Sequence, residues 1–128
     1  MNVVDSSAWI EYFTGGPNAR RFSPPIHRTS ELLVPSICLL EVYRWVLRNA
    51  GRPEALRVAA SMRQGRLVEL DTPIALHAAE LGQAHGLPLA DSVIYATARL
   101  HQATVWTQDS DFEGLEDVRF LETSTRDG

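Results

Sequence analysis

The feature that most constrains the fold is the alternation of short runs rich in β-branched residues with longer stretches of helical character. Strands separated by helices form a parallel sheet, because each helix returns the chain to the same end of the sheet. The pattern therefore predicts an α/β protein, a three-layer α/β/α sandwich whose parallel sheet is covered by helices on both faces. The expected strands are Asn2–Asp5, Leu32–Val34, Leu67–Leu70, Thr104–Thr107 and Val118–Leu121.

Helices are expected between these strands because capping residues, prolines and glycines mark their ends. Ser36 is a favourable N-cap, Pro73 suits a first helical turn, and Gly51 and Gly86 favour helix termination. The expected helices cover residues 6–13, 36–50, 53–64, 74–85 and 91–101.

Two segments fall outside this alternation. Residues 17–30 are rich in proline and arginine, and the pair Pro24-Pro25 predicts that they contain no long helix. Residues 109–116 are expected to be a loop or a short helix. Because no repeat, linker or low-complexity stretch divides the chain, residues 1–122 are predicted to form a single domain, followed by a polar tail at residues 123–128.

Composition excludes several classes of protein. The chain has 128 residues, of which 45% are hydrophobic, and this suits one globular domain rather than a disordered chain. There is no apolar stretch long enough to span a membrane and no basic segment ahead of the apolar N-terminal run, so we expect a cytoplasmic protein with no membrane association. The single cysteine, Cys38, excludes an intrachain disulfide, and its apolar neighbours predict a buried side chain. Four histidines without paired spacing argue against a zinc site.

The charged residues leave two interpretations open. All of the basic residues are arginines, which indicates either phosphate recognition or the codon usage of a GC-rich genome. A net charge of -4 argues against an ordinary nucleic-acid-binding module but not against a nuclease that holds divalent cations. Arg20, Arg21 and Arg28 either bind RNA phosphates or keep their segment soluble.

Acidic residues follow two of the predicted strands at the end where parallel sheets bind ligands. Asp5 ends the first strand and Asp109 follows the strand Thr104–Thr107, so their side chains converge if these strands are neighbours. Each also has an ordinary structural interpretation. Asp5 and Asp91 are both placed to cap a following helix, and Asp109 and Asp111 suit a turn.

Glu41 is harder to explain structurally, because it interrupts an apolar helical segment expected to pack on the sheet. A carboxylate buried there needs a partner or a metal ion. The structural alternative is an ion pair with Arg44 or Arg48, which lie three and seven residues onward on nearly the same helix face.

Several carboxylates at one place repel one another unless a cation lies between them. A site with oxygen ligands alone favours Mg²⁺ or Mn²⁺ over softer metals, and such ions promote phosphodiester hydrolysis. The sequence therefore predicts a metal-dependent hydrolytic centre.

Four short motifs carry a family resemblance. They are Val4-Asp5-Ser6-Ser7, Leu39-Leu40-Glu41-Val42, Leu89-Ala90-Asp91-Ser92 and Thr107-Gln108-Asp109-Ser110-Asp111-Phe112. Their order and spacing over nearly the whole chain resemble the PIN-domain ribonucleases, and in particular the VapC toxins of bacterial toxin–antitoxin pairs.

The resemblance implies a specific site and fold. The catalytic, metal-binding acids would be Asp5, Glu41, Asp91 and Asp109, binding Mg²⁺ or Mn²⁺, with Asp111 as a secondary metal ligand. The hydroxyls of Ser7 and Thr107 would orient the acids or a water molecule. The implied fold has a five-stranded parallel sheet between helices and is usually homodimeric.

The expected function is that of an endoribonuclease toxin that cleaves RNA and is held inactive by a cognate antitoxin protein. Two alternatives stay open on the same fold: an RNA-processing PIN nuclease without an antitoxin, and a non-catalytic PIN-like binding module. A Mg²⁺ phosphatase of another α/β fold, with Asp5 as nucleophile, is disfavoured because it would usually need a lysine and the chain has none.

Overall fold

Five parallel strands in the order β3-β2-β1-β4-β5 form the central sheet in the computed structural model, which describes residues 1–123. Each predicted strand is present, with ends that shift by one or two residues at most. The strands are β1 (Asn2–Val4), β2 (Leu32–Pro35), β3 (Arg66–Val68), β4 (Thr104–Thr107) and β5 (Val118–Phe120).

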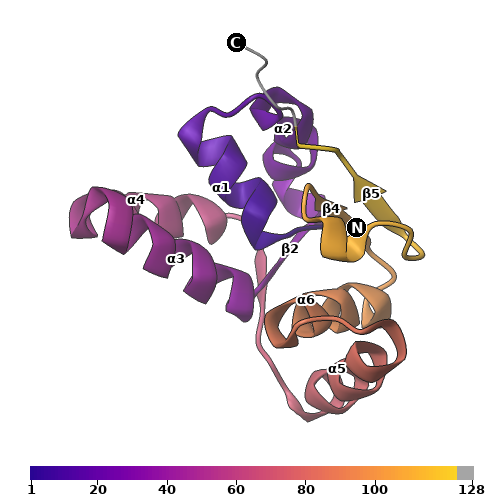
Figure 1. The fold of residues 1–128 in the computed structure, drawn as a ribbon. Helices are drawn as coiled ribbons and strands as arrows, with labels where there is room; N and C mark the ends of the chain where they lie inside the picture. Colours follow the sequence, from indigo (N-terminus) through magenta and orange to yellow (C-terminus); the bar gives the residue numbers. More distant parts are fainter. Residues whose placement is uncertain (124–128) are drawn as a thin grey trace.

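Helices cover both faces of this sheet, which confirms the α/β/α sandwich (Figure 1). In Figure 1, α1 and α2 lie above the strands and α5 and α6 below them, whereas α3 and α4 pack against each other as an arm that extends to one side. The helices are α1 (Ser6–Thr14), α2 (Ala19–His27), α3 (Ser36–Ala50), α4 (Arg52–Met62), α5 (Thr72–His85) and α6 (Leu89–Leu100), with 3-10 turns η1 (Thr29–Glu31) and η2 (Ser110–Phe112).

Helix α2 corrects the prediction for residues 17–30, because the helix continues through Pro24 and Pro25. Pro24 has no N–H to donate to the carbonyl of Arg20, but the Ser23 hydroxyl donates to that carbonyl at 2.8 Å. Phe22, Pro25 and Ile26 are buried on one face of the helix. The packing of this apolar face and the substitute hydrogen bond offset the two backbone bonds that Pro24 and Pro25 cannot donate.

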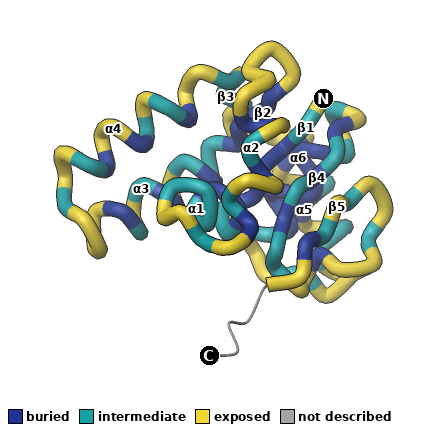
Figure 2. Tube along the Cα trace, turned by 90° about the horizontal axis from the view of Figure 1, so that it is seen from above, coloured by how far each residue is buried: buried dark blue, intermediate teal, exposed yellow. Residues whose placement is uncertain are grey.

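The core lies on the two faces of the inner strands. Val3, Val4, Leu33, Val34 and Val105 have no exposed surface, as expected for strands covered on both sides (Figure 2). Cys38 is also fully buried, with its Sγ 3.8 Å from the carbonyl oxygen of Val4, so the prediction of a buried side chain is confirmed.

Two further expectations concern membrane association and the polar tail. Within residues 1–123, no helix is long and apolar enough to span a membrane. The predicted polar tail at residues 123–128 lies, apart from Thr123, outside the described residues.

Candidate metal centre

The carboxyl ends of β1 and β4 place the first two site residues side by side. The strands are neighbours in register, with Val4 opposite Trp106, and the amide of Asp5 donates to the Trp106 carbonyl at 3.0 Å. One residue further along β4, Thr107 Oγ1 donates to Asp5 Oδ2 at 2.8 Å. Two segments about 100 residues apart therefore meet at this edge of the sheet.

Asp5 is almost fully buried and surrounded by hydrogen-bond donors. Its Oδ1 accepts from the Ala8 amide at 3.0 Å, so it caps α1, and the Ser7 hydroxyl donates to both carboxylate oxygens. The pKa of Asp5 is raised to about 6. Burial is the largest cause and the charge of Asp109 adds to it, whereas the bonds from Ala8, Thr107 and Ser7 lower it. Ser7 and Thr107 thus fix the orientation of this carboxylate.

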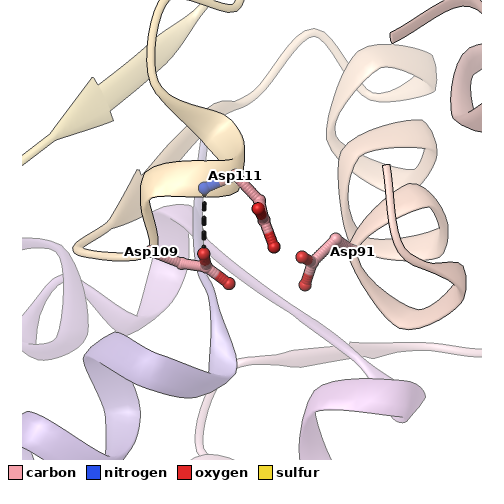
Figure 3. A group of neighbouring side chains, drawn as sticks. All are labelled: Asp91, Asp109 and Asp111. Carbon is pink, nitrogen blue, oxygen red and sulfur yellow. Dashed lines mark hydrogen bonds between the residues drawn. The ribbon is translucent and has the colours of Figure 1, made fainter. Parts of the chain in front are cut away.

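A second group of carboxylates lies beside Asp5. Asp91, Asp109 and Asp111 each contribute one oxygen to a set whose members lie within 4.8 Å of one another (Figure 3). Asp91 projects from the first turn of α6, whereas Asp109 and Asp111 come from the start of η2. The loop is held by two backbone amides: Asp109 N donates to Thr107 Oγ1 and Asp111 N donates to Asp109 Oδ1, both at 2.9 Å.

The structural interpretations of Asp109 and Asp91 have different outcomes. Asp109 caps η2, in agreement with its turn interpretation. Asp91 caps nothing, because α6 begins at Leu89 and its N-cap is Pro88. The capping interpretation of Asp91 is therefore wrong, and its carboxylate remains available to a ligand.

Partial burial and, after it, repulsion within this group raise the pKa of Asp91 to about 7. Partial burial is the largest cause, followed by the negative charges of Asp109 and Asp5 and by a hydrogen bond and charge from Asp111. Without a cation, the Asp91 carboxyl is therefore largely protonated below about pH 7. A divalent cation would replace that proton and remove the repulsion.

Glu41 borders the site from α3. The Ser6 hydroxyl donates to Glu41 Oε1 at 2.7 Å, and no basic side chain of residues 1–123 lies within 4.0 Å of the Glu41 carboxylate. The alternative that Arg44 or Arg48 neutralises Glu41 is therefore wrong. Glu41 lies outside the 4.8 Å group, as does Asp5.

The buried thiol of Cys38 lies among these acids. Burial raises its pKa well above the usual value, and the charges of Asp5, Glu41 and Asp91 raise it further, while Ser6 lowers it. The charges of three acids, one directly after β1 and the others on α3 and α6, therefore all act on one buried position.

The donor set fits a hard divalent cation. The ligand atoms that come together are carboxylate oxygens, and none of the five acids forms an ion pair with an arginine or histidine of residues 1–123. Mg²⁺ and Mn²⁺ prefer such oxygen ligands. Asp91, Asp109 and Asp111 could bind such an ion directly, whereas Asp5 and Glu41 lie outside this group.

The structure separates the three arginines that were considered for RNA binding. Arg20 and Arg21 are exposed at the start of α2, close to Asn18, whose side chain donates to Gln108 Oε1 at 3.1 Å near the acid edge. Arg28 ends the helix just before η1 and β2, at the opposite, amino edge of the sheet. The three side chains do not form one surface beside the acids.

Sequence patterns did not identify a small network that supports the Asp109 loop. Glu11 Oε2 accepts from the Asn18 amide at 2.8 Å, and the Asn18 side chain bonds both Gln108 and the Glu122 carbonyl at 3.1 Å. Asn18 is 4% exposed, so its amide is satisfied inside the protein. The only sequence signal was an asparagine following the Gly15-Gly16-Pro17 turn, which reads equally well as a loop residue.

Comparison with known families gives the decisive match: residues 3–118 match the model of the PIN domain. The chain belongs to the PIN-domain family. Among curated proteins, none matches the sequence.

Solved structures show that this PIN domain shares its fold with bacterial toxins. A toxin–antitoxin complex from Klebsiella pneumoniae superposes with a TM-score of 0.82 at 22% identity, covering 95% of this chain and 99% of that one. The DNA-bound VapBC of Salmonella typhimurium gives 0.71 at 18% identity, with 97% and 100% covered. Mycobacterium tuberculosis VapC20, a toxin that cleaves the sarcin–ricin loop, gives 0.71 at 19% identity, with 93% and 99% covered.

Proposed function

We propose that this PIN domain is a metal-dependent endoribonuclease that hydrolyses RNA phosphodiester bonds and serves as the toxin of a VapBC-type toxin–antitoxin pair. The observation that carries the proposal is the group of Asp91, Asp109 and Asp111 oxygens within 4.8 Å, next to the buried Asp5 and without a basic side chain to neutralise it. The fold shared with VapBC toxins supports the choice of RNA as substrate and of an antitoxin as partner.

Each acid has a distinct part in this proposal. Asp91, Asp109 and Asp111 hold Mg²⁺ or Mn²⁺, while Ser7 and Thr107 keep the Asp5 carboxylate turned toward them. The bound cation supplies charge that stabilises the phosphodiester oxygens and promotes attack by water.

Glu41 lies on the α3 side of the site, where the Ser6 hydroxyl holds its carboxylate. Within residues 1–123 no hydrogen bond engages the second oxygen, Oε2, which could therefore contact the substrate or another bound ligand.

A cleavage assay tests the nuclease. Purified protein should cleave single-stranded RNA with Mg²⁺ or Mn²⁺, stop in excess EDTA, and recover when the ion is restored. Glu41→Gln should lose most activity, whereas Glu113→Gln, an exposed glutamate after η2, should keep it. Equal cleavage in EDTA would overturn the metal mechanism. Absence of any cleavage with either ion would favour the non-catalytic binding module.

The aromatic side chains of α1 offer an antitoxin only a limited apolar contact. Trp9 has no exposed surface and stacks on Phe13 in the core at 5.6 Å between ring centroids. Of these aromatic side chains, only Tyr12 and Phe13 retain some exposed surface.

Co-expression tests the antitoxin partner. The product of a neighbouring small gene should form a stable complex with this protein and reduce its RNA cleavage. If none binds and expression leaves growth unaffected, an RNA-processing nuclease becomes the better proposal.

A homodimer is supported by apolar surface around α5 and α6. Leu76 and Leu89 are 64% and 85% exposed, and Leu89 lines an apolar cavity of about 280 Å³ with Leu70, Ala75 and other small side chains. A second copy of the chain would bury these leucines. Light scattering should give twice the chain mass, and Leu89→Asp should give the monomer.

A cytoplasmic location accords with the proposed role of this protein as a nuclease that cuts cellular RNA.

A further inference from the structure

A hollow of about 210 Å³ lies on the outer surface of α3, next to the acid centre. Its lining residues are Glu41, Arg44, Trp45 and Arg48, and we call this surface the α3 groove. Their spacing of three, four and seven residues puts all of them on one face of the helix, over about 10 Å along its axis. Because α3 follows β2 directly at Pro35, its first turns start at the same sheet edge as the acid centre.

The two arginines of the groove have no acidic partner. Arg44 and Arg48 are exposed, and neither lies within 4.0 Å of a carboxylate in residues 1–123. Within residues 1–123, Arg57 of the arm pairs with Glu54, and Arg99 of α6 pairs with Glu116 and Asp117, whereas Arg52 of the arm forms no such pair. Two guanidinium groups free to bind an anion are therefore concentrated beside an acidic centre.

Trp45 adds a flat apolar surface between these charges. Its side chain is half-buried against the core and also lines the hollow. An indole beside two guanidinium groups suits a nucleotide, because the ring stacks on a base while each guanidinium binds phosphate through two parallel hydrogen bonds.

We propose that the α3 groove binds the RNA strand flanking the cleaved phosphodiester, with Arg44 and Arg48 on its phosphates and Trp45 stacked on a base. This deepens the proposed nuclease function and rests on it. Glu41 belongs to both surfaces, so a strand lying in the groove leads directly to the acid centre. The positive charges of Arg44 and Arg48 offset the repulsion between RNA phosphates and a protein of net charge -4.

Binding measured without cleavage tests the groove. The probe is a fluorescein-labelled single-stranded RNA of twelve mixed-sequence nucleotides, titrated by anisotropy in EDTA at several salt concentrations. The double variant Arg44→Ala/Arg48→Ala should bind about tenfold or more weakly, and the slope of log affinity against log salt should fall by about 0.7 for each lost phosphate contact.

Trp45 should behave differently from the arginines. Trp45→Ala should weaken binding roughly tenfold with an unchanged salt slope, because stacking releases no counterions, and Trp45→Phe should restore most of the affinity. The matched control is Arg63→Ala/Arg66→Ala, which removes the same charge from exposed positions at the amino end of β3, on the opposite edge of the sheet.

The outcomes separate the two proposals. If the wild type cleaves RNA with Mg²⁺ or Mn²⁺ but the groove variants match the control in affinity and salt slope, the groove inference is overturned and the nuclease proposal stands. If the groove variants keep RNA affinity but lose the antitoxin complex, the groove is a protein interface and the inference is likewise overturned. If the wild type neither binds nor cleaves RNA, the proposed nuclease function is contradicted, and the groove inference that rests on it is overturned as well.

Discussion

Asp5 and Asp91 are neighbouring carboxylates with pKa values raised for different reasons. Asp5 is 2% exposed, and its raised pKa comes from burial that three donors, Ala8, Ser7 and Thr107, partly offset. Asp91 is less buried and receives no such donors; its pKa is raised by burial and then by the charges of Asp109, Asp5 and Asp111.

The difference shows that the fold supplies hydrogen-bond donors to one acid, whereas the other lies among repelling charges. Removing the charge of Asp5 disturbs a helix cap and a strand-to-strand hydrogen bond. Removing the charge of Asp91 relieves repulsion and breaks no helix cap. Each prediction below tests this contrast.

The largest effect is expected from Asp91→Asn. RNA cleavage should fall about 100-fold or more, since a metal ligand is lost and metal ions contribute several kcal/mol to such reactions. In EDTA the melting temperature should stay level or rise, because one repelling charge is gone. Cleavage rates and thermal unfolding of the same preparation measure both quantities. A clear loss of stability in EDTA would assign Asp91 a structural role.

Thr107→Val should cost about 2 kcal/mol of unfolding free energy, because the hydroxyl both donates to Asp5 and accepts from the Asp109 amide. Thr107 links the two carboxylate groups, so this change tests whether the buried Asp5 depends on it. Urea unfolding in EDTA gives the value. Thr107→Ser should keep most of the stability, and Thr104→Val, at the other end of β4, serves as the control. A difference below 0.5 kcal/mol, about the lower limit for one hydrogen bond, would contradict the linking role.

Mn²⁺ or Mg²⁺ at ten times its Kd should stabilise the wild type by about 1.4 kcal/mol, which corresponds to a rise of about 5 °C in Tm. Asp111→Asn should lose part of this rise, because Asp111 belongs to the 4.8 Å group. Differential scanning fluorimetry with and without the ion measures the shift. The same rise in Asp91→Asn and in the wild type would place the cation elsewhere.

The last prediction concerns pH in the metal-free protein. Both carboxyls have folded-state pKa values above the ordinary 3.8, so the stabilisation they give is fully present below pH 3.8 and is lost as pH rises through about 6 for Asp5 and 7 for Asp91. Unfolding free energies in EDTA should therefore decline between pH 4 and pH 7, and decline less in Asp91→Asn. Parallel curves for the two proteins would show that Asp91 does not titrate in this range.

The fold was predictable wherever one local signal determined an element. The strand Thr104–Thr107 was predicted with its observed ends, because a β-branched run lies between a helix end and a turn. Helix α2 was not, because two prolines outweigh any local helical signal. Its stability comes from buried side chains and from the Ser23 hydroxyl, neither of which a sequence pattern displays.

The site could be predicted only in part, for a similar reason. Placing Asp5 near Asp109 needed only strand order and the rule for parallel sheets. The motifs nominated the candidate site acids, but their spatial grouping depends on tertiary structure. Asp111 joins Asp91 and Asp109 in one group, whereas Asp5 and Glu41 lie outside it. The pairing of Ser6 with Glu41, rather than Glu41 with an arginine, depends on the packing of α1 against α3.

The strand order has a consequence for how this protein is made. β1 is the first strand in the chain but lies in the middle of the sheet, between β2 and β4. During translation its second partner does not exist until residues 104–107 have been synthesised, and the acids at 109 and 111 follow later still. Pairing of segments so distant in sequence is slow, because the intervening chain must be ordered first. A nascent chain therefore carries Asp5 and Glu41 long before it carries the rest of the acid cluster, which cannot assemble until synthesis has passed β4.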